Sequence, residues 1–265
     1  MRCLPSRRVI LCYGAVPMSA PLDSSTQTLA APAPPRTRIF INRLLFRGML
    51  FSMGSIAVVM YRVIRDKNVT WRFAKAQART LARLCGVRIC IRGVEHLGAG
   101  PYMFTPNHQS HFDIAALLGY LPGNNRFAAK KEMFNEPVLG AVLRTMGMIP
   151  IDRDNPLEAI QLLSRLRDDH FSTIVFPEGT RSRDGALLPF KKGPFVAAIH
   201  LGIPVVPVVC KGTQQVMPKG HYLSILPGEA EVVVLEPIPT SELTYDDRDR
   251  LRDLVRQRIA DELKR

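Results

Sequence analysis

From the run VRICIRG at residues 87–93 onward, short apolar runs alternate with segments of helical periodicity, and this alternation limits the folds open to the chain. Runs typical of strands fall at 87–93, 101–107, 126–130, 148–152, 172–179, 204–210 and 229–238. Helical segments lie near 111–120, 135–146, 156–169, 193–201 and 242–264. Such alternation predicts an α/β fold, with a mostly parallel twisted sheet flanked by helices.

The predicted helix at 156–169 has the clearest start signal. Asn155 suits the cap position, Pro156 the first helical position and Glu158 the first turn.

Composition divides the 265 residues into three parts. Residues 1–35 are rich in Pro, Ala, Ser and Thr, and we interpret them as a disordered, dispensable leader. The stretch RRVILCYGAVPMSA weakly imitates a signal peptide, and Met18 is an alternative start. Residues 36–88 form a basic, apolar segment, and residues 89–265 form the α/β domain.

The positive charge is concentrated in one segment. The whole chain has a net charge of +13, and residues 36–92 carry thirteen Lys or Arg against the single acid Asp66. The remainder from residue 93 is close to neutral. A nucleic-acid-binding protein more often spreads basic residues over its folded body. We therefore expect no nucleic-acid partner and an anionic surface instead.

The same segment is strongly apolar. Its uncharged run at 48–61 spans roughly 21 Å as a helix, short of the ~30 Å hydrocarbon core. An interfacial or re-entrant helix suits it better than a transmembrane one, although flanking arginines could snorkel around a short span. In a second helix, Phe73, Leu81 and Leu84 are available to one face, and the other face is basic, with Arg72, Lys75, Arg79 and Arg83.

Two such helices predict an N-terminal two-helix motif that docks on an anionic membrane surface. The alternative is a pair of helices packed on the protein's own core.

The cysteines show no CxxC pair and no metal-like spacing with histidine. We expect ordinary reduced thiols in a protein that faces the cytosol. The residues concerned are Cys3, Cys12, Cys85, Cys90 and Cys210.

A histidine and an aspartate five residues apart, His108 and Asp113, follow the strand-like run YMFTPN. His108 falls in the turn before a predicted helix, and Asp113 in that helix's first turn. One interpretation is structural, because Ser110 to Asp113 matches the capping-box pattern S-x-x-[DE]. In the other, the carboxylate holds one tautomer of His108, whose free nitrogen accepts a proton from a substrate hydroxyl. The chain has no GxSxG elbow, so the nucleophile would belong to the substrate.

A second cluster follows another apolar run, and it comprises Glu178, Gly179, Thr180 and Arg181. Small residues that expose backbone beside an arginine suit an anion such as phosphate, held by a guanidinium fork. Lys192 follows in a loop, and Arg153 follows another strand-like run. Each signal is weak alone, but in α/β folds ligands gather where strands end.

Together these motifs resemble the glycerolipid acyltransferases, specifically the 1-acylglycerol-3-phosphate O-acyltransferases. NHQSHFD matches the family's NHxxxxD pattern, with His108 and Asp113 in the defining places. GMIPIDR, FPEGTRS and IPVVPVV resemble its second, third and fourth blocks, in order over roughly residues 100–210. AKKEM, which contains Lys130, and PFKKGPF, which contains Lys192, are also similar. The leader before residue 36 lies outside the resemblance.

The resemblance implies that 89–265 is an acyltransferase domain with a defined reaction. His108, oriented by Asp113, deprotonates the 2-hydroxyl of a 1-acyl-sn-glycerol 3-phosphate, and the alkoxide attacks the thioester of acyl-CoA or acyl-carrier protein. Phosphatidic acid results, and no metal or organic cofactor is implied. Implied substrate-binding residues are Arg153, Glu178, Gly179, Thr180, Arg181, Lys130 and Lys192.

The implied partners are the acyl donor, lysophosphatidic acid and an anionic membrane surface, at the cytoplasmic face of the inner membrane. The same His–Asp pair would serve glycerol 3-phosphate, a lyso-ornithine lipid or another lysophospholipid. The alternative from a different class is a non-catalytic lipid-binding module. The donor, the acyl-chain length and the depth of membrane insertion stay open at this point.

Overall fold

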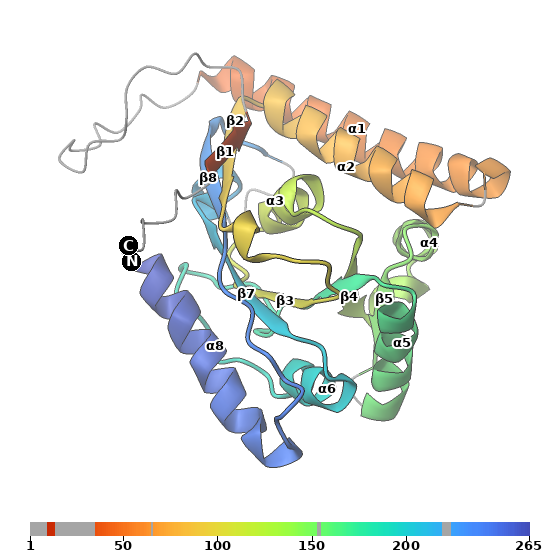
Figure 1. The fold of residues 1–265 in the computed structure, drawn as a ribbon. Coiled ribbons are helices and arrows are strands. Elements are labelled where there is room, and N and C mark those ends of the chain that lie inside the picture. The colour runs from red at the N-terminus through yellow and green to blue at the C-terminus, as the bar shows by residue number, and fades with distance from the viewer. Residues whose placement is uncertain (1–9, 14–34, 65, 153–154, 219–223) are drawn as a thin grey trace, which may run out of the picture.

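The computed structural model describes residues 10–13, 35–64, 66–152, 155–218 and 224–265. In this part of the chain an eight-stranded sheet has the order β1-β2-β8-β7-β3-β6-β4-β5 (Figure 1). Of its neighbouring pairs, β1–β2 and β7–β8 are antiparallel and the other five are parallel. The strands are β1 (Ile10–Tyr13), β2 (Val87–Arg92), β3 (Met103–Pro106), β4 (Asn125–Lys130), β5 (Ile149–Ile151), β6 (Ser172–Ile174), β7 (Val205–Lys211) and β8 (Gly228–Val234). The predicted α/β fold with a mostly parallel sheet is confirmed.

Helices cover both faces of the sheet (Figure 1). The first core includes side chains of α2 (Lys67–Leu84) and α3 (Phe112–Tyr120), and the second those of α5 (Pro156–Asp168), α6 (Gly193–Leu201) and α8 (Arg248–Leu263). Alternate residues of β7 enter opposite cores: Val206 and Val208 the first, Val205 and Val209 the second. A strand buried on both faces needs apolar residues throughout, which explains the continuous apolar run at this position.

The predicted elements from residue 87 onward match observed ones, with differences at their ends. The strand predicted at 172–179 ends at Ile174, and the chain then turns through the FPEGTRS motif. The last helix begins at Arg248, after a 3₁₀ turn (Tyr245–Asp247) that Thr244 closes with a capping box. Asn155 caps α5 as predicted, since its side chain accepts a hydrogen bond from the Glu158 N–H at 3.4 Å.

The N-terminal helices form a hairpin above α3 (Figure 1). α1 (Arg36–Ile64) is one helix of 29 residues that lies alongside α2. The buried Asn42 anchors it, because its amide donates to the carbonyls of Cys85 at 3.1 Å and Ile225 at 2.8 Å. Within the described ranges, no helix combines the length and the apolar character that crossing a membrane requires.

α2 differs in part from the predicted two-faced helix. Arg72 and Arg83 are exposed, but Lys75 and Arg79 are half-buried and donate hydrogen bonds to backbone carbonyls at the end of α3. One face of α2 also belongs to the first core, with Trp71, Ala74, Ala78, Leu81 and Ala82. Packing on the protein's own core is therefore confirmed for this face, because aromatic and small residues recur there at helical spacing.

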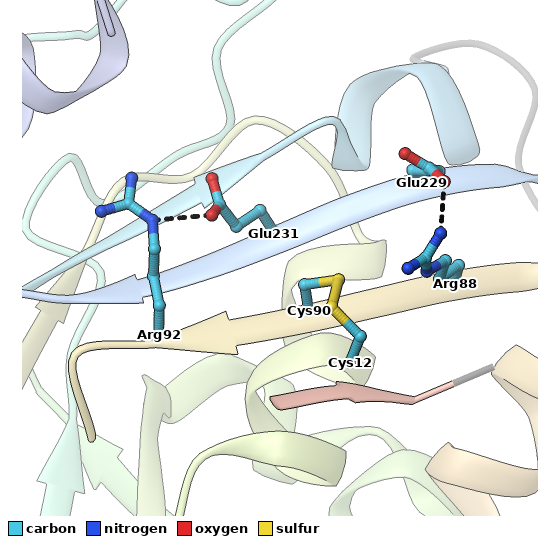
Figure 2. Close-up of a disulfide and its surroundings, with 6 residues drawn as sticks. All are labelled: Cys12, Arg88, Cys90, Arg92, Glu229 and Glu231. Atoms are coloured by element: carbon cyan, nitrogen blue, oxygen red, sulfur yellow. Dashed lines mark hydrogen bonds and ion pairs between the residues drawn. A yellow bond between two sulfur atoms is a disulfide. The ribbon is translucent and has the colours of Figure 1, made fainter. Parts of the chain in front are cut away.

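Cys12 and Cys90 form a disulfide (Figure 2), so the expectation of reduced thiols is wrong for this pair. β1 pairs antiparallel with β2, and the two cysteines stand opposite each other in the register. Directly opposite residues bring their Cβ atoms close enough for a disulfide. They are 78 residues apart in the chain, so spacing could not reveal the pairing. Cys85 and Cys210 are buried and free.

The same strand corrects the expectation of a wholly disordered leader. Ile10–Tyr13 pairs with β2 over four positions at the edge of the sheet. The rest of that segment, residues 1–9 and 14–34, lies outside the described residues, so its prediction stands untested.

Candidate functional site

The candidate site lies where β3 and β6 end. These strands are parallel neighbours, so the NHQSHFD turn after β3 and the FPEGTRS turn after β6 leave the sheet at the same edge. The Ser182 N–H donates to the carbonyl of His108 at 2.9 Å, which joins the two turns directly. The structure thus brings together two motifs about 70 residues apart.

Asp113 gathers three hydrogen bonds at one oxygen. Its Oδ2 lies 2.8 Å from Nδ1 of His108, and it accepts the backbone N–H groups of Gln109 and Ser110, each at 2.8 Å. The carboxylate is fully buried. The structural and catalytic interpretations of Asp113 are therefore compatible, since one oxygen closes the turn before α3 and also meets the imidazole. With a proton on Nδ1, the other ring nitrogen, Nε2, keeps its lone pair.

The imidazole of His108 is also held through its face. It stacks on Phe176, with ring centroids 3.9 Å apart and an interplanar angle of 22°. The side chain keeps 12% of its surface exposed. A ring packed on one side and hydrogen-bonded at one nitrogen has little freedom to rotate, and a small part of its surface stays exposed.

Two further residues anchor the histidine turn. The buried amide of Asn107 donates to the carbonyl of Cys210 at 3.1 Å and accepts its N–H at 2.7 Å, as a neighbouring strand would. Ser110 Oγ donates to the carbonyl of Met217 at 2.9 Å. Asn107 and Phe176 both stand inside the quoted motifs, which was the available signal, but sequence reasoning assigned them no role because their partners are distant in the chain.

Glu178, which the resemblance implies to be a substrate-binding residue, has both carboxyl oxygens hydrogen-bonded to the backbone. Its Oε1 accepts the His108 N–H at 2.6 Å and its Oε2 accepts the Leu188 N–H at 3.1 Å. Burial raises the pKa of this carboxyl to about 7, although the two backbone donors act to lower it. Both oxygens are therefore engaged by the protein backbone, so the carboxylate ties the following loop to the histidine turn.

The other predicted site residues lie at different distances from this centre. Arg181 is half-buried and Thr180 exposed, and Gly179 has a φ of 68°, which favours glycine. Lys130 is exposed at the end of β4. Lys192 is exposed and pairs with Asp249 of α8 at 3.0 Å. Arg153 lies outside the described residues.

A second histidine of the motif, His111, stands beside the pair. Desolvation and the positive charge of Arg181 together lower its pKa to about 4. Its imidazole is therefore neutral at neutral pH. Over the described ranges, no group of three or more His, Cys, Asp or Glu side chains is arranged to hold a metal ion.

Comparison with known proteins identifies the fold and the family. The family model described as Acyltransferase matches residues 88–211. The chain is 32% identical to human 1-acyl-sn-glycerol-3-phosphate acyltransferase alpha over 84% of its own length and 80% of that protein. It is 37% identical to the chloroplastic enzyme BAT2 of Brassica napus, over 65% of this chain and 50% of that protein.

The crystal structure of the 1-acyl-sn-glycerophosphate (LPA) acyltransferase PlsC from Thermotoga maritima has the same fold. Its TM-score is 0.70 at 24% identity, and the match covers 86% of this chain and 96% of that one. The fold is that of this acyltransferase structure. The chain belongs to the 1-acyl-sn-glycerol-3-phosphate acyltransferase family of enzymes.

The environment of Glu178 predicts a pH dependence of stability. Between its ordinary value of 4.5 and its raised pKa of about 7, the folded protein keeps a proton that the unfolded chain releases. The free energy of unfolding should therefore fall as pH rises through this range, by about 2–3 kcal/mol from this group. Glu178→Gln removes the titration, so urea unfolding at pH 5 and pH 7 should show a smaller decline.

The matched control is Glu242→Gln, which changes an exposed glutamate. Its decline between the two pH values should equal that of the wild type. Parallel curves for wild type and Glu178→Gln would contradict the raised pKa.

Proposed function

We propose that this enzyme transfers an acyl chain from acyl-CoA or acyl-carrier protein to the 2-hydroxyl of 1-acyl-sn-glycerol 3-phosphate, which forms phosphatidic acid. His108 is the general base and Asp113 its partner. The observation that carries the proposal is the 2.8 Å contact between Asp113 Oδ2 and His108 Nδ1. The names of the human and Brassica napus relatives give the same acceptor.

The step needs no nucleophile from the protein. Asp113 holds Nδ1, so Nε2 of His108 is the nitrogen that takes the proton of the acceptor hydroxyl. As the O–H bond breaks, the oxygen forms a bond to the thioester carbonyl, and the thiolate leaves with its electron pair. Proton abstraction by a positioned base contributes about 10²–10⁴ in rate. Holding both substrates together supplies much of the rest.

The acceptor phosphate is bound by the FPEGTRS turn in this proposal. Arg181 supplies the guanidinium, and Gly179 and Thr180 supply backbone close to the phosphate. Lys130 and Arg153 are further candidates, and Lys192 would have to leave Asp249 to take part. Glu178 acts here as a positioning residue, because its oxygens hold backbone N–H groups.

The helix hairpin docks the enzyme on an anionic membrane surface. Large apolar side chains are exposed on it, namely Phe40, Ile41, Leu44, Val59, Val63 and Leu84. Between α1 and α2 lies an apolar groove of 520 Å³, lined among others by Leu45, Phe73 and Ala76. The same two helices carry the exposed basic residues Arg47, Arg72 and Arg83. Apolar surface with basic residues is what binds the headgroup layer.

The proposed location is the cytoplasmic face of the inner membrane, where the thioester donor is available. Reduced cysteines would support a location that faces the cytosol, but Cys12 and Cys90 form a disulfide and give no such support. The location therefore rests on the donor alone.

The reaction is tested by acyl transfer from labelled acyl-CoA to lysophosphatidic acid in anionic vesicles. Wild type should form phosphatidic acid, and His108→Ala should lose about 10²–10⁴ in kcat while its thermal unfolding is unchanged. Acyl-carrier protein as donor, and glycerol 3-phosphate or a lyso-ornithine lipid as acceptor, are run in parallel. A folded His108→Ala that stays nearly as active would end the mechanism, and a wild type that uses only another acceptor would end the substrate assignment.

The phosphate contact is tested by comparing two arginines of one loop. Arg181→Met should raise KM for lysophosphatidic acid about tenfold, since a hydrogen bond to a charged group contributes about 1.5–3 kcal/mol. Arg183→Met removes an exposed charge two residues away and should leave KM within about twofold. Equal KM values for the two variants would exclude Arg181 as the ligand.

Membrane docking is tested by flotation with vesicles of defined charge. Leu44→Glu together with Leu84→Glu places two carboxylates on the exposed face of the hairpin and should release the protein from anionic vesicles. Wild type should bind these vesicles, more weakly as salt rises, and should bind neutral vesicles less. Binding of both proteins to the same extent would disprove the assigned surface, and stronger retention on DNA would favour a nucleic-acid partner.

A further inference from the structure

Two basic residues of α2 reach the carboxyl end of α3. Arg79 Nε donates to the carbonyl of Gly119 at 2.6 Å, and Lys75 Nζ donates to the carbonyls of Leu121 and Gly123, both at 2.9 Å. Gly119 lies in the last turn of α3 and Leu121 is its C-cap, whereas Gly123 lies two residues beyond. The last carbonyls of a helix have no partner within the helix, and they carry its negative dipole end. Cationic donors are the groups that satisfy both needs.

The partial burial of two like charges without a carboxylate partner destabilises the fold, which indicates that the contact has a function. Lys75 and Arg79 lie four residues apart with the same charge, and among the described residues neither pairs with a carboxylate. Burial, with the charges of Arg79 and Arg126, lowers the pKa of Lys75 to about 8. Lys75 and Arg79 were predicted to lie on a lipid-facing surface, but their hydrogen-bond partners are inside the protein.

The two helices also approach closely at this point. A Cβ atom on Gly119 would lie 3.5 Å from the Cβ of Ala78 and 3.5 Å from Cγ of Arg79. The guanidinium of Arg79 lies 6.0 Å from the ring centre of Tyr120. α3 is thus held along α2 by packing and at its end by hydrogen bonds.

The other end of α3 carries Asp113. α3 has nine residues, and a helix of that length is marginal without tertiary contacts. A short helix moves as a unit, so a shift at its carboxyl end is transmitted to its first turn. The contact that depends on this first turn is the 2.8 Å contact from Asp113 to His108.

We propose that Lys75 and Arg79 are positioning residues of the acyl-transfer reaction, which hold the carboxyl end of α3 and so keep the Asp113 carboxylate against His108. The inference rests on the proposed function of this pair. It also gives α2 two roles, because the helix proposed to meet the membrane is the one that holds the catalytic helix.

The test is a double-mutant cycle on kcat, measured with lysophosphatidic acid and acyl-CoA at saturation in anionic mixed micelles. Arg79→Met keeps the aliphatic stem and removes the donor. It should lower kcat about tenfold or more, since a misplacement of 1 Å costs up to about 10²-fold, and it should leave KM within about twofold. In an Asp113→Asn background the same change should lower kcat less than about twofold, because the route through Asp113 is already lost.

Two variants separate positioning from stability. Arg79→Lys retains a cationic donor and should recover most of the kcat. Arg258→Met removes an arginine of α8 that donates to the carbonyl of Glu236 at 3.4 Å, and it should leave kcat unchanged. If Arg79→Met does not fold, Arg79→Gln, which keeps an amide donor without the charge, takes its place in the cycle.

The outcomes distinguish this inference from the function on which it rests. Equal losses of kcat in the two backgrounds, or a kcat of Arg79→Met equal to that of wild type, would overturn the positioning role. If wild type is active and His108→Ala is inactive in the same assay, the proposed function still holds. A wild type without acyl transfer would instead overturn the proposed function itself. The inference is supported if Arg79→Met lowers kcat when Asp113 is present and has little effect in the Asp113→Asn background.

Discussion

The site depends on one buried oxygen, Oδ2 of Asp113, which accepts three hydrogen bonds. Two come from backbone N–H groups of Gln109 and Ser110, and these shape the turn between β3 and α3. The third contact is with His108. The same atom therefore folds the turn and orients the imidazole, so the loss of this carboxylate would disturb both. An aspartate that closes a short turn can therefore also hold an imidazole.

The sheet places the groups that surround this oxygen. Parallel neighbours end at one edge, so the turns after β3 and β6 meet there, and Glu178 joins them by accepting the His108 N–H. β7, the other neighbour of β3, supplies the backbone of Cys210 that Asn107 grips on both sides. The histidine turn is thus held from both adjacent strands and from the ring of Phe176. In the proposed mechanism a base held in this way loses little freedom when the substrate binds, which favours proton transfer.

The N-terminal helices are part of the folded body as well as a basic surface. Trp71 and Ala74 of α2 lie in the first core, and Asn42 ties α1 to the body through two backbone carbonyls. The hairpin and α3, which carries Asp113, are therefore one packed unit. At the far edge of the sheet, β1 is joined to β2 by the Cys12–Cys90 disulfide. Both features bring residues from before the α/β domain into contact with it.

The sequence by itself determined the elements, the fold class and the two motifs, because local periodicity, capping residues such as Asn155, and the spacing of NHQSHFD act over a few residues. It determined the family for the same reason. Tertiary structure alone decided which groups meet: that Glu178 binds backbone, that Lys75 and Arg79 turn inward to α3, and that Cys12 reaches Cys90. These contacts join residues 40 to 78 positions apart. Charge and periodicity indicate which face a residue occupies, but its partner depends on how the strands are ordered and the helices packed.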